Sequence, residues 1–104
     1  MEFEKKEVDI ISQTLTVPLM AFGYDKLKGK IGEEQIGRVK LILDQLRQLS
    51  VVNREDLSFL MIVFLYSRDI IDWIEYPTLT GFTWEESTDL IIKIIKNLQQ
   101  DING

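Results

Sequence analysis

The chain contains neither cysteine nor histidine. Without cysteine it has no disulfide framework, no thiolate nucleophile and no zinc site of the cysteine type. Without histidine it lacks the commonest general base and the commonest metal ligand. The composition therefore excludes Ser-His and Cys-His hydrolases, di-iron proteins with a Glu-x-x-His motif, and zinc hydrolases.

Long apolar runs and a strong charge of one sign are also lacking. The longest apolar run covers the 8 residues from Phe59 to Tyr66, whereas a membrane-spanning helix needs about 20. The first ten residues, MEFEKKEVDI, are charged and lack the apolar core of a signal peptide, so we expect a cytoplasmic protein without membrane contact. The formal net charge is −5, from 17 acidic and 12 basic residues, which disfavours binding to nucleic-acid phosphates.

The length of 104 residues fits one domain, residues 1–104. A domain of this size buries roughly 65% of the surface that its unfolded chain exposes, which is enough for a core without a metal or disulfide. Isoleucine is frequent, with 14 residues, which is typical of A/T-rich bacterial or phage coding sequences.

The apolar run lies in the middle of residues 53–76, which we expect to form the central helix. A surface helix has one apolar stripe, whereas a helix that is apolar on all sides must be buried on most of them. Asn53 is a suitable N-cap, with Glu55 and Asp56 in the first turn where the helix dipole favours carboxylates. Pro77 is expected to end the helix, because the residue before a proline avoids helical backbone angles.

Three amphipathic segments flank the central helix in the sequence. The first, residues 3–22, has apolar side chains at helical spacing, but Pro18 indicates that the helix ends or kinks near Thr16. The second covers residues 33–49, and the last begins at a capping box made by Thr83 and Glu86. The pattern predicts an all-α fold of four helices, arranged as a bundle-like single domain with short loops.

Two connecting segments are expected to be loops. Residues 24–31 follow Gly23, a natural helix terminator, and residues 77–81 begin with a proline and end with a glycine. The first loop carries the only basic cluster of the chain, Lys26, Lys28 and Lys30. This cluster is either simply solvated or a contact for an acidic partner or a phosphate.

Two pairs of carboxylates lie where the central helix is expected to meet the last one. Asp69 and Asp72 are three residues apart, as are Glu86 and Asp89, so each pair shares one helix face. If the two helices form a hairpin, all four carboxylates lie at the same end of the domain. Four oxygen ligands on facing helices suit Mg²⁺ when substrate phosphates complete its shell.

This arrangement resembles the all-α nucleotide pyrophosphatases of the MazG and dimeric dUTPase kind. Their signature is Glu-x-x-Glu, followed one helical hairpin later by Glu-x-x-Asp. The resemblance covers 21 residues, 69–89, and the first pair is Asp-x-x-Asp in this chain. It implies an Mg²⁺-dependent nucleotide hydrolase in which Asp69, Asp72, Glu86 and Asp89 hold the metal. The alternative is that these are solvated charges at helix ends.

A helix-turn-helix regulator is a further alternative, with residues 33–49, a turn at residues 49–52 and the central helix as the recognition helix. The central helix begins with Arg54, Glu55 and Asp56 and is then apolar. A recognition helix instead presents polar and basic side chains to the major groove. The sequence therefore disfavours DNA recognition.

Aromatic side chains gather on the central helix or directly after it. Four short helices cannot easily bury all of them together with 14 isoleucines and 13 leucines. They form either the core with its margin or an exposed aromatic patch ringed by charges, which is the composition of interface hot spots. The second alternative predicts the partner-binding residues Tyr66, Arg68, Asp69, Asp72, Trp73, Glu75, Tyr76 and Trp84.

The function that these residues favour is non-enzymatic binding of another protein. The aromatic side chains would insert into the partner, and Asp69, Asp72 and Glu75 would steer a basic surface toward them. An inhibitor, an immunity protein, a phage-encoded modulator and an adaptor all fit this description, and none of them needs a cofactor. The surplus of apolar surface would equally suit a homodimer, with the second face of the central helix at its seam.

Overall fold

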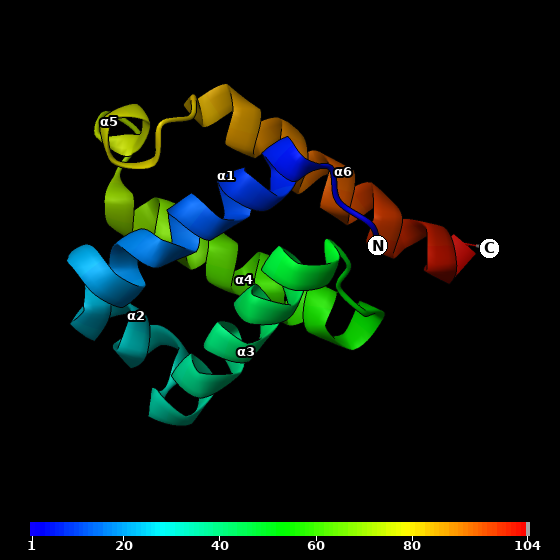
Figure 1. Ribbon diagram of the computed structural model, residues 1–104, viewed down its shortest axis with the longest axis horizontal. Coiled ribbons are helices and arrows are strands. Elements are labelled where there is room, and N and C mark those ends of the chain that lie inside the picture. The colour runs from blue at the N-terminus through cyan, green and yellow to red at the C-terminus, as the bar shows by residue number, and fades with distance from the viewer. Residues whose placement is uncertain (104) are drawn as a thin grey trace.

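The computed structural model describes the backbone of residues 1–103 and the side chains of residues 1–100 (Figure 1). The described chain forms six α-helices and one short π-helix, and its only other regular element is a bridge between Glu2 and Val51. The elements in order are α1 (Lys5–Thr16), η1 (Val17–Ala21), α2 (Tyr24–Ile31), α3 (Glu33–Leu49), α4 (Arg54–Ile71), α5 (Tyr76–Thr80) and α6 (Trp84–Asn103). The predicted all-α fold is confirmed.

The predicted helix caps are present at the starts of α4 and α6. The Asn53 side chain accepts a hydrogen bond from the backbone N–H of Asp56 at 2.9 Å. At the start of α6, the N–H of Glu86 donates to Thr83 Oγ1 and the N–H of Thr83 donates to Glu86 Oε1, each at 3.0 Å. These bonds satisfy backbone donors that a helix leaves unpaired at its N-terminus.

Helix α4 lies at the centre of the fold, as the sequence predicts. Every other helix, and η1, contacts it, and Figure 1 shows α1 crossing it with α3 and α6 on either side. Leu60, Val63 and Phe64 are fully buried in the main core. On the opposite face, Ile62 and Leu65 remain exposed, so the helix is covered on most sides but not on all.

The expectation of a loop at residues 24–31 is wrong, because this segment forms α2. Leu27 is fully buried and Ile31, one turn later, packs against the same core. Asp25 in the first turn and Lys30 in the last turn match the helix dipole. A single pair of apolar side chains is too short a pattern to show a helical period in sequence, so contact with the core determines this helix.

Helix α1 ends at Thr16, and the chain continues past Pro18 as the π-helix η1, a point that the sequence leaves open. The backbone widens after Thr16 into the π-helix η1, with Pro18 near its start. Because proline has no N–H and its ring crowds the preceding turn, the α-helical bonding pattern cannot pass through it unchanged. Gly23 then ends the segment with a φ of 86°, and a Cβ at this position would overlap Ile70 of α4.

The central helix ends at Ile71, five residues before the predicted end, and residues 77–81 are not all loop. Asp72 leaves the helix with a φ of 73° while its N–H still donates to the carbonyl of Arg68 at 3.2 Å. Pro77 lies in the first turn of α5, a position where the missing N–H of proline costs nothing. Proline therefore starts a helix here and does not end one.

The described residues include no helix that is long and apolar enough to cross a membrane. This agrees with the short apolar run in the sequence.

The assignment of α2 as a helix predicts opposite effects of two glycine substitutions. A Cβ at Gly29 in α2 or at Gly81 after α5 meets no atom within 4 Å, so packing does not distinguish the two sites. Gly29→Ala should stabilise the protein by about 0.5–1 kcal/mol, because glycine weakens a helix interior. Gly81→Ala should destabilise it, because Gly81 has a φ of 82°. Urea unfolding measures both, and a loss of stability in Gly29→Ala would contradict a helix at α2.

Candidate interaction surface at the α4–α5 turn

The turn between α4 and α5, residues 72–75, exposes two large apolar side chains. Trp73 is 63% exposed and Ile74 is 66% exposed. The positive φ of Asp72 breaks α4 directly before them, so they leave the helical path and do not continue its buried face. The ψ of Asp72 is 141°, outside the left-handed helical region in which aspartate is enriched. Asp72 and Glu75, at the two ends of the turn, are also exposed, so carboxylates flank the apolar pair.

Tyr76 belongs to the core and not to the exposed patch that the sequence predicts. Its side chain is fully buried and, with Val17 and Ile71, forms a second small cluster of buried apolar residues. Its hydroxyl and Thr14 Oγ1 are 2.6 Å apart in a hydrogen bond between α5 and α1. A buried tyrosine with a satisfied hydroxyl is a structural residue. Tyr76 therefore fixes the end of the turn and is not itself exposed on the surface.

Arg68 is also buried, where the sequence predicts it at the rim of an exposed patch. Its guanidinium carbon lies 3.7 Å from the ring centroid of Trp84, and Nη2 donates to Thr88 Oγ1 at 2.7 Å. Burial lowers the pKa of Arg68, and the electrostatic interaction with Tyr76 partly opposes this shift. Within the described part of the chain its Nε has no hydrogen-bond partner. Arg68 joins α4 to the first turns of α6.

Trp84 links these two buried groups. Its ring meets that of Tyr76 edge-to-face, with centroids 5.4 Å apart and an interplanar angle of 89°, which is a favourable aromatic geometry. Because Trp84 lies half-buried between Tyr76 and Arg68, it belongs to the support of the turn. Of the four predicted aromatic anchors, only Trp73 is strongly exposed.

The other predicted surface residues lie on the side of α4 that faces α2. The Tyr66 ring is half-buried, and the Lys30 ammonium group lies 5.7 Å from its centroid. Asp69 lines an open cleft of about 410 Å³ between α2 and α4, together with Asp25, Lys26 and Lys30. The basic cluster and Asp69 are thus brought together, which the sequence does not indicate. Tyr66 lies two helical turns before the Trp73 turn.

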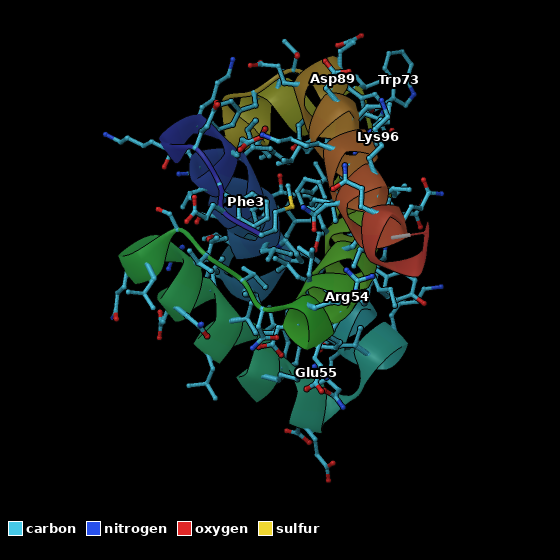
Figure 2. The ribbon with its side chains drawn as sticks, turned by 90° about the vertical axis from the view of Figure 1, so that its right-hand side faces the viewer. Phe3, Arg54, Glu55, Trp73, Asp89 and Lys96 are labelled. Carbon is cyan, nitrogen blue, oxygen red and sulfur yellow. The ribbon has the colours of Figure 1, made fainter. Side chains whose placement is uncertain are left out.

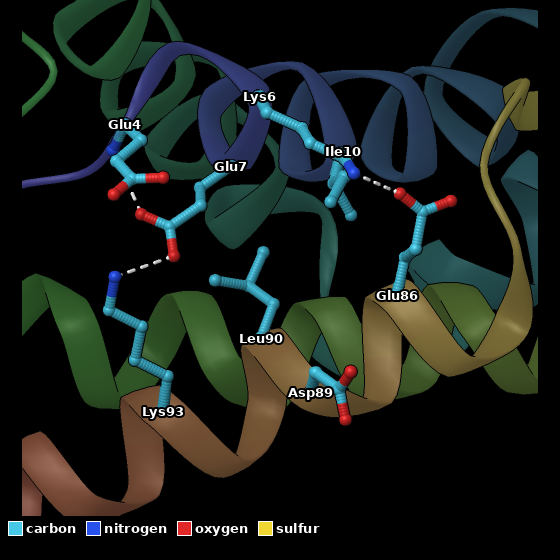
Figure 3. Close-up of a pocket in the computed structure, with 8 residues that line it drawn as sticks. All are labelled: Glu4, Lys6, Glu7, Ile10, Glu86, Asp89, Leu90 and Lys93. Atoms are coloured by element: carbon cyan, nitrogen blue, oxygen red, sulfur yellow. Dashed lines mark hydrogen bonds and ion pairs between the residues drawn. The ribbon is translucent and has the colours of Figure 1, made fainter.

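The four carboxylates proposed for Mg²⁺ do not form a metal site. No three acidic side chains among the described residues lie close enough together to hold a metal ion. Glu86 forms an ion pair with Lys6 of α1 at 2.5 Å and also closes the capping box with Thr83. Asp89 faces the cleft between α1 and α6 (Figure 3). Residues 1–100 therefore do not gather these four carboxylates at one place, as the hydrolase alternative needs.

The cleft between α1 and α6 is bridged by two ion pairs. Lys6 pairs with Glu86, and Lys93 donates to Glu7 at 2.8 Å, on either side of Ile10 and Leu90 (Figure 3). The hydrogen bond from Lys6 is the largest cause that lowers the pKa of Glu86, and the same bond raises the pKa of Lys6. The cleft of about 250 Å³ is thus a salt-bridged helix contact.

Sequence reasoning missed the exposure of Ile74. Ile74 follows Ile71 and Leu60 at helical spacing, so the pattern places it on the buried face of a helix that continues to residue 76. Only the break at Asp72 moves it to the surface, and a sequence gives little sign of a positive φ at an aspartate. Phe22, at the end of η1, is also exposed.

The chain matches no protein-family model, no curated protein and no solved structure. Its function therefore has to be inferred from the surface itself.

The buried position of Tyr76 predicts that removal of its hydroxyl group lowers the stability of the protein. Tyr76→Phe removes the bond to Thr14 Oγ1 and should lower the free energy of unfolding by about 0.5–1.5 kcal/mol. Tyr24→Phe is a matched control at an exposed site and should change it by less than about 0.5 kcal/mol. Chemical denaturation of both variants tests this. Equal stabilities of Tyr76→Phe and the unchanged protein would contradict a structural role for the hydroxyl.

The lowered pKa of Glu86 predicts that the stability of the protein depends on pH in the acidic range. A carboxyl whose pKa is lower in the folded state stabilises the fold above its unfolded pKa, about 4.5, and this contribution disappears as the pH falls through the folded pKa. Glu86→Gln keeps a capping-box side chain but removes the charge. The variant should therefore lose less stability than the unchanged protein between about pH 5 and pH 3. Parallel slopes in thermal unfolding, with Glu85→Gln as control, would contradict a stabilising Lys6–Glu86 pair.

Proposed function

We propose that this protein is a non-enzymatic interaction protein whose α4–α5 turn inserts into a pocket on a basic surface of a partner protein. The observation that carries this proposal is the pair Trp73 and Ile74, both about two-thirds exposed on one turn. Large adjacent apolar side chains ringed by polar groups mark interaction sites, and tryptophan is among the residues most enriched at binding hot spots.

The rigidity of the base supports this proposal. Tyr76 directly follows the turn and is held by its hydrogen bond to Thr14 and by its ring contact with Trp84. At the other end, the N–H of Asp72 is bonded to the last turn of α4. A side chain that is presented on a fixed backbone loses less conformational freedom on binding than one on a free loop. Trp73 is therefore well suited to act as an anchor.

The charge around the turn supports a basic partner. Asp69, Asp72 and Glu75 are all exposed, whereas Arg68, which precedes Asp69, is buried under Trp84. Asp72 and Glu75 therefore leave the turn acidic, whereas Asp69 lies beside Lys26 and Lys30 in the cleft between α2 and α4. Complementary charge increases the rate of association and discriminates between partners. A partner with Lys or Arg around an apolar pocket fits this surface.

Enzymatic alternatives receive little support from the geometry. Of the four carboxylates of the hydrolase alternative, Glu86 and Asp89 line the cleft between α1 and α6. Asp69 lines the separate cleft between α2 and α4, and Asp72 lies at the end of α4. For DNA recognition, α4 would have to enter a major groove, but every other helix packs on it. The proposal therefore concerns binding in the cytoplasm by an inhibitor, an immunity protein, a phage-encoded modulator or an adaptor.

Removal of the tryptophan should abolish partner binding without loss of the fold. Trp73→Ala should weaken the complex by about 30-fold or more, the effect of losing a hot spot worth about 2 kcal/mol. Because Trp73 makes few contacts within the chain, the free energy of unfolding should change by less than about 0.5 kcal/mol. The measurement is affinity capture from cell lysate with quantitative mass spectrometry, followed by titration with the captured partner.

The control for this experiment is Leu41→Ala, which removes another strongly exposed side chain, on α3. A protein that binds the α4–α5 turn should be captured by the Leu41→Ala variant and not by the Trp73→Ala variant. If every captured protein binds both variants equally, the turn is not the binding surface.

The carboxylates of the turn should act mainly on the rate of association. In the double variant Asp72→Asn with Glu75→Gln, the association rate constant should fall and its dependence on ionic strength should weaken, while the dissociation rate constant changes little. Surface plasmon resonance at low and moderate salt measures both constants. Faster dissociation with unchanged association would contradict electrostatic steering and would indicate direct contacts instead.

A further inference from the structure

A cleft of about 260 Å³ lies between α3 and the point where α1 passes into η1. This volume is close to the lower limit of small-molecule sites, about 300 Å³. The lining combines apolar and charged side chains from both sides of the cleft: Thr16, Leu19, Met20, Lys40, Leu43, Asp44 and Arg47. The cleft has room for a small ligand, and the chemistry of this lining indicates its class.

The floor of this cleft is apolar. Leu43 is buried in the main core, and Leu19 is half-buried against the same core. Met20, which also lines the cleft, is 82% exposed, and a methionine side chain is flexible enough to adapt to different apolar groups. Leu19 and Met20 both belong to η1, and π-helical turns are frequent at functional sites. An apolar chain thus finds a fixed floor and one adaptable wall.

Arg47 is held at this cleft by two hydroxyl groups of α1. Its Nε donates to Ser12 Oγ at 3.4 Å, and its Nη2 donates to Thr16 Oγ1 at 3.2 Å. A guanidinium has five N–H donors, so Nη1 and the second N–H of Nη2 remain for a ligand. Among the described residues, no carboxylate forms an ion pair with Arg47. The side chain is thus oriented by neutral groups, and its charge is not paired.

The charged residues of the lining favour one negative charge. Lys40 lies two helical turns before Arg47 on α3, with Asp44 between them, and all three are exposed. Two cations and one carboxylate give the cleft a formal charge of +1, on a chain whose net charge is −5. A monoanion matches this charge. A dianion would be repelled by Asp44 and by the rest of the chain.

We propose that this cleft binds a small amphiphilic monocarboxylate, with its carboxylate at Arg47 and its apolar chain over Leu19, Met20 and Leu43. The paired N–H groups of a guanidinium match the two oxygens of a carboxylate, and such charge-assisted bonds are roughly twice as strong as neutral ones. Removal of the apolar chain from water supplies the rest of the affinity. Lys40 adds positive potential at the same cleft without having to contact the ligand.

This cleft is separate from the α4–α5 turn. Figure 2 shows Trp73 at the upper end of the molecule, beside the start of α6, whereas α3 lies at the lower end. Figure 1 shows the same separation between α5 and α3. The carboxylate site therefore does not rest on the proposed binding of a partner protein, and either proposal can fail without the other.

The test is titration of the full chain with octanoate below its micelle concentration, observed by amide NMR spectroscopy. Octanoate should bind saturably with a dissociation constant of about 1 mM or lower, and the signals that shift should belong to residues 16–20 and 40–47. Octylamine has the same chain and the opposite charge, and should bind about tenfold more weakly or worse. Octyl phosphate, with nearly two negative charges at neutral pH, should also bind more weakly than octanoate.

Arg47→Gln should weaken octanoate binding by about tenfold or more, and Lys40→Gln by a smaller factor. Lys40 makes no hydrogen bond or ion pair among the described residues, so its variant tests the charge even if Arg47→Gln destabilises the fold. Lys5→Gln removes the same charge from an exposed position outside the cleft and should leave binding unchanged.

Absence of saturable binding, shifts confined to other residues, or equal binding of octylamine would overturn the proposal. The same holds if Arg47→Gln and Lys40→Gln bind octanoate as well as Lys5→Gln does. Tighter binding of octyl phosphate than of octanoate would overturn the assignment of a monocarboxylate.

Discussion

The fold depends on the need to cover α4, which carries apolar side chains on every side. Each of the other helices, including the five-residue α5, packs on it. Burial of an aliphatic or aromatic side chain contributes about 1.5–3 kcal/mol, so even α2, with Leu27 as its one fully buried side chain, is held in place by this contact. A chain of 104 residues supplies helices for most of the circumference of α4 but leaves the side with Ile62 and Leu65 open. The uncovered face follows from having too few helices for so apolar a centre.

A second constraint fixes the end of the domain where α4 stops. The main core does not extend to Tyr76, which instead packs with Val17 and Ile71 in a separate small cluster. The hydrogen bond between Tyr76 and Thr14 joins residues 62 positions apart in sequence, and it closes α5 onto α1. Between this attachment and the end of α4 only residues 72–75 remain, which is too short a segment for Trp73 to turn back into the core. The exposure of Trp73 is therefore a consequence of how tightly its neighbours are held.

Sequence patterns predict the four long helices and their caps because those features are local. Apolar spacing and the side chains of Asn53 and Thr83 act within one or two turns. The missed features depend on distant contacts. Helix α2 depends on the burial of Leu27 in a core built from other segments, and the end of α4 depends on the positive φ of Asp72, which Pro77 does not cause. For the site, composition identified Trp73 and the nearby carboxylates, but it could not separate Trp73 from Tyr76, because two aromatic residues three positions apart look alike until their partners are known.

The distribution of charge determines which contacts the α4–α5 turn can make. A net charge of −5 makes two copies repel one another at long range, and this repulsion is screened within about 10 Å at 0.1 M salt. At the α4–α5 turn, Asp72 and Glu75 are exposed, whereas Arg68 is buried and contacts Trp84. A second copy of this acidic chain is a poor match for the turn, and a basic protein is a good one.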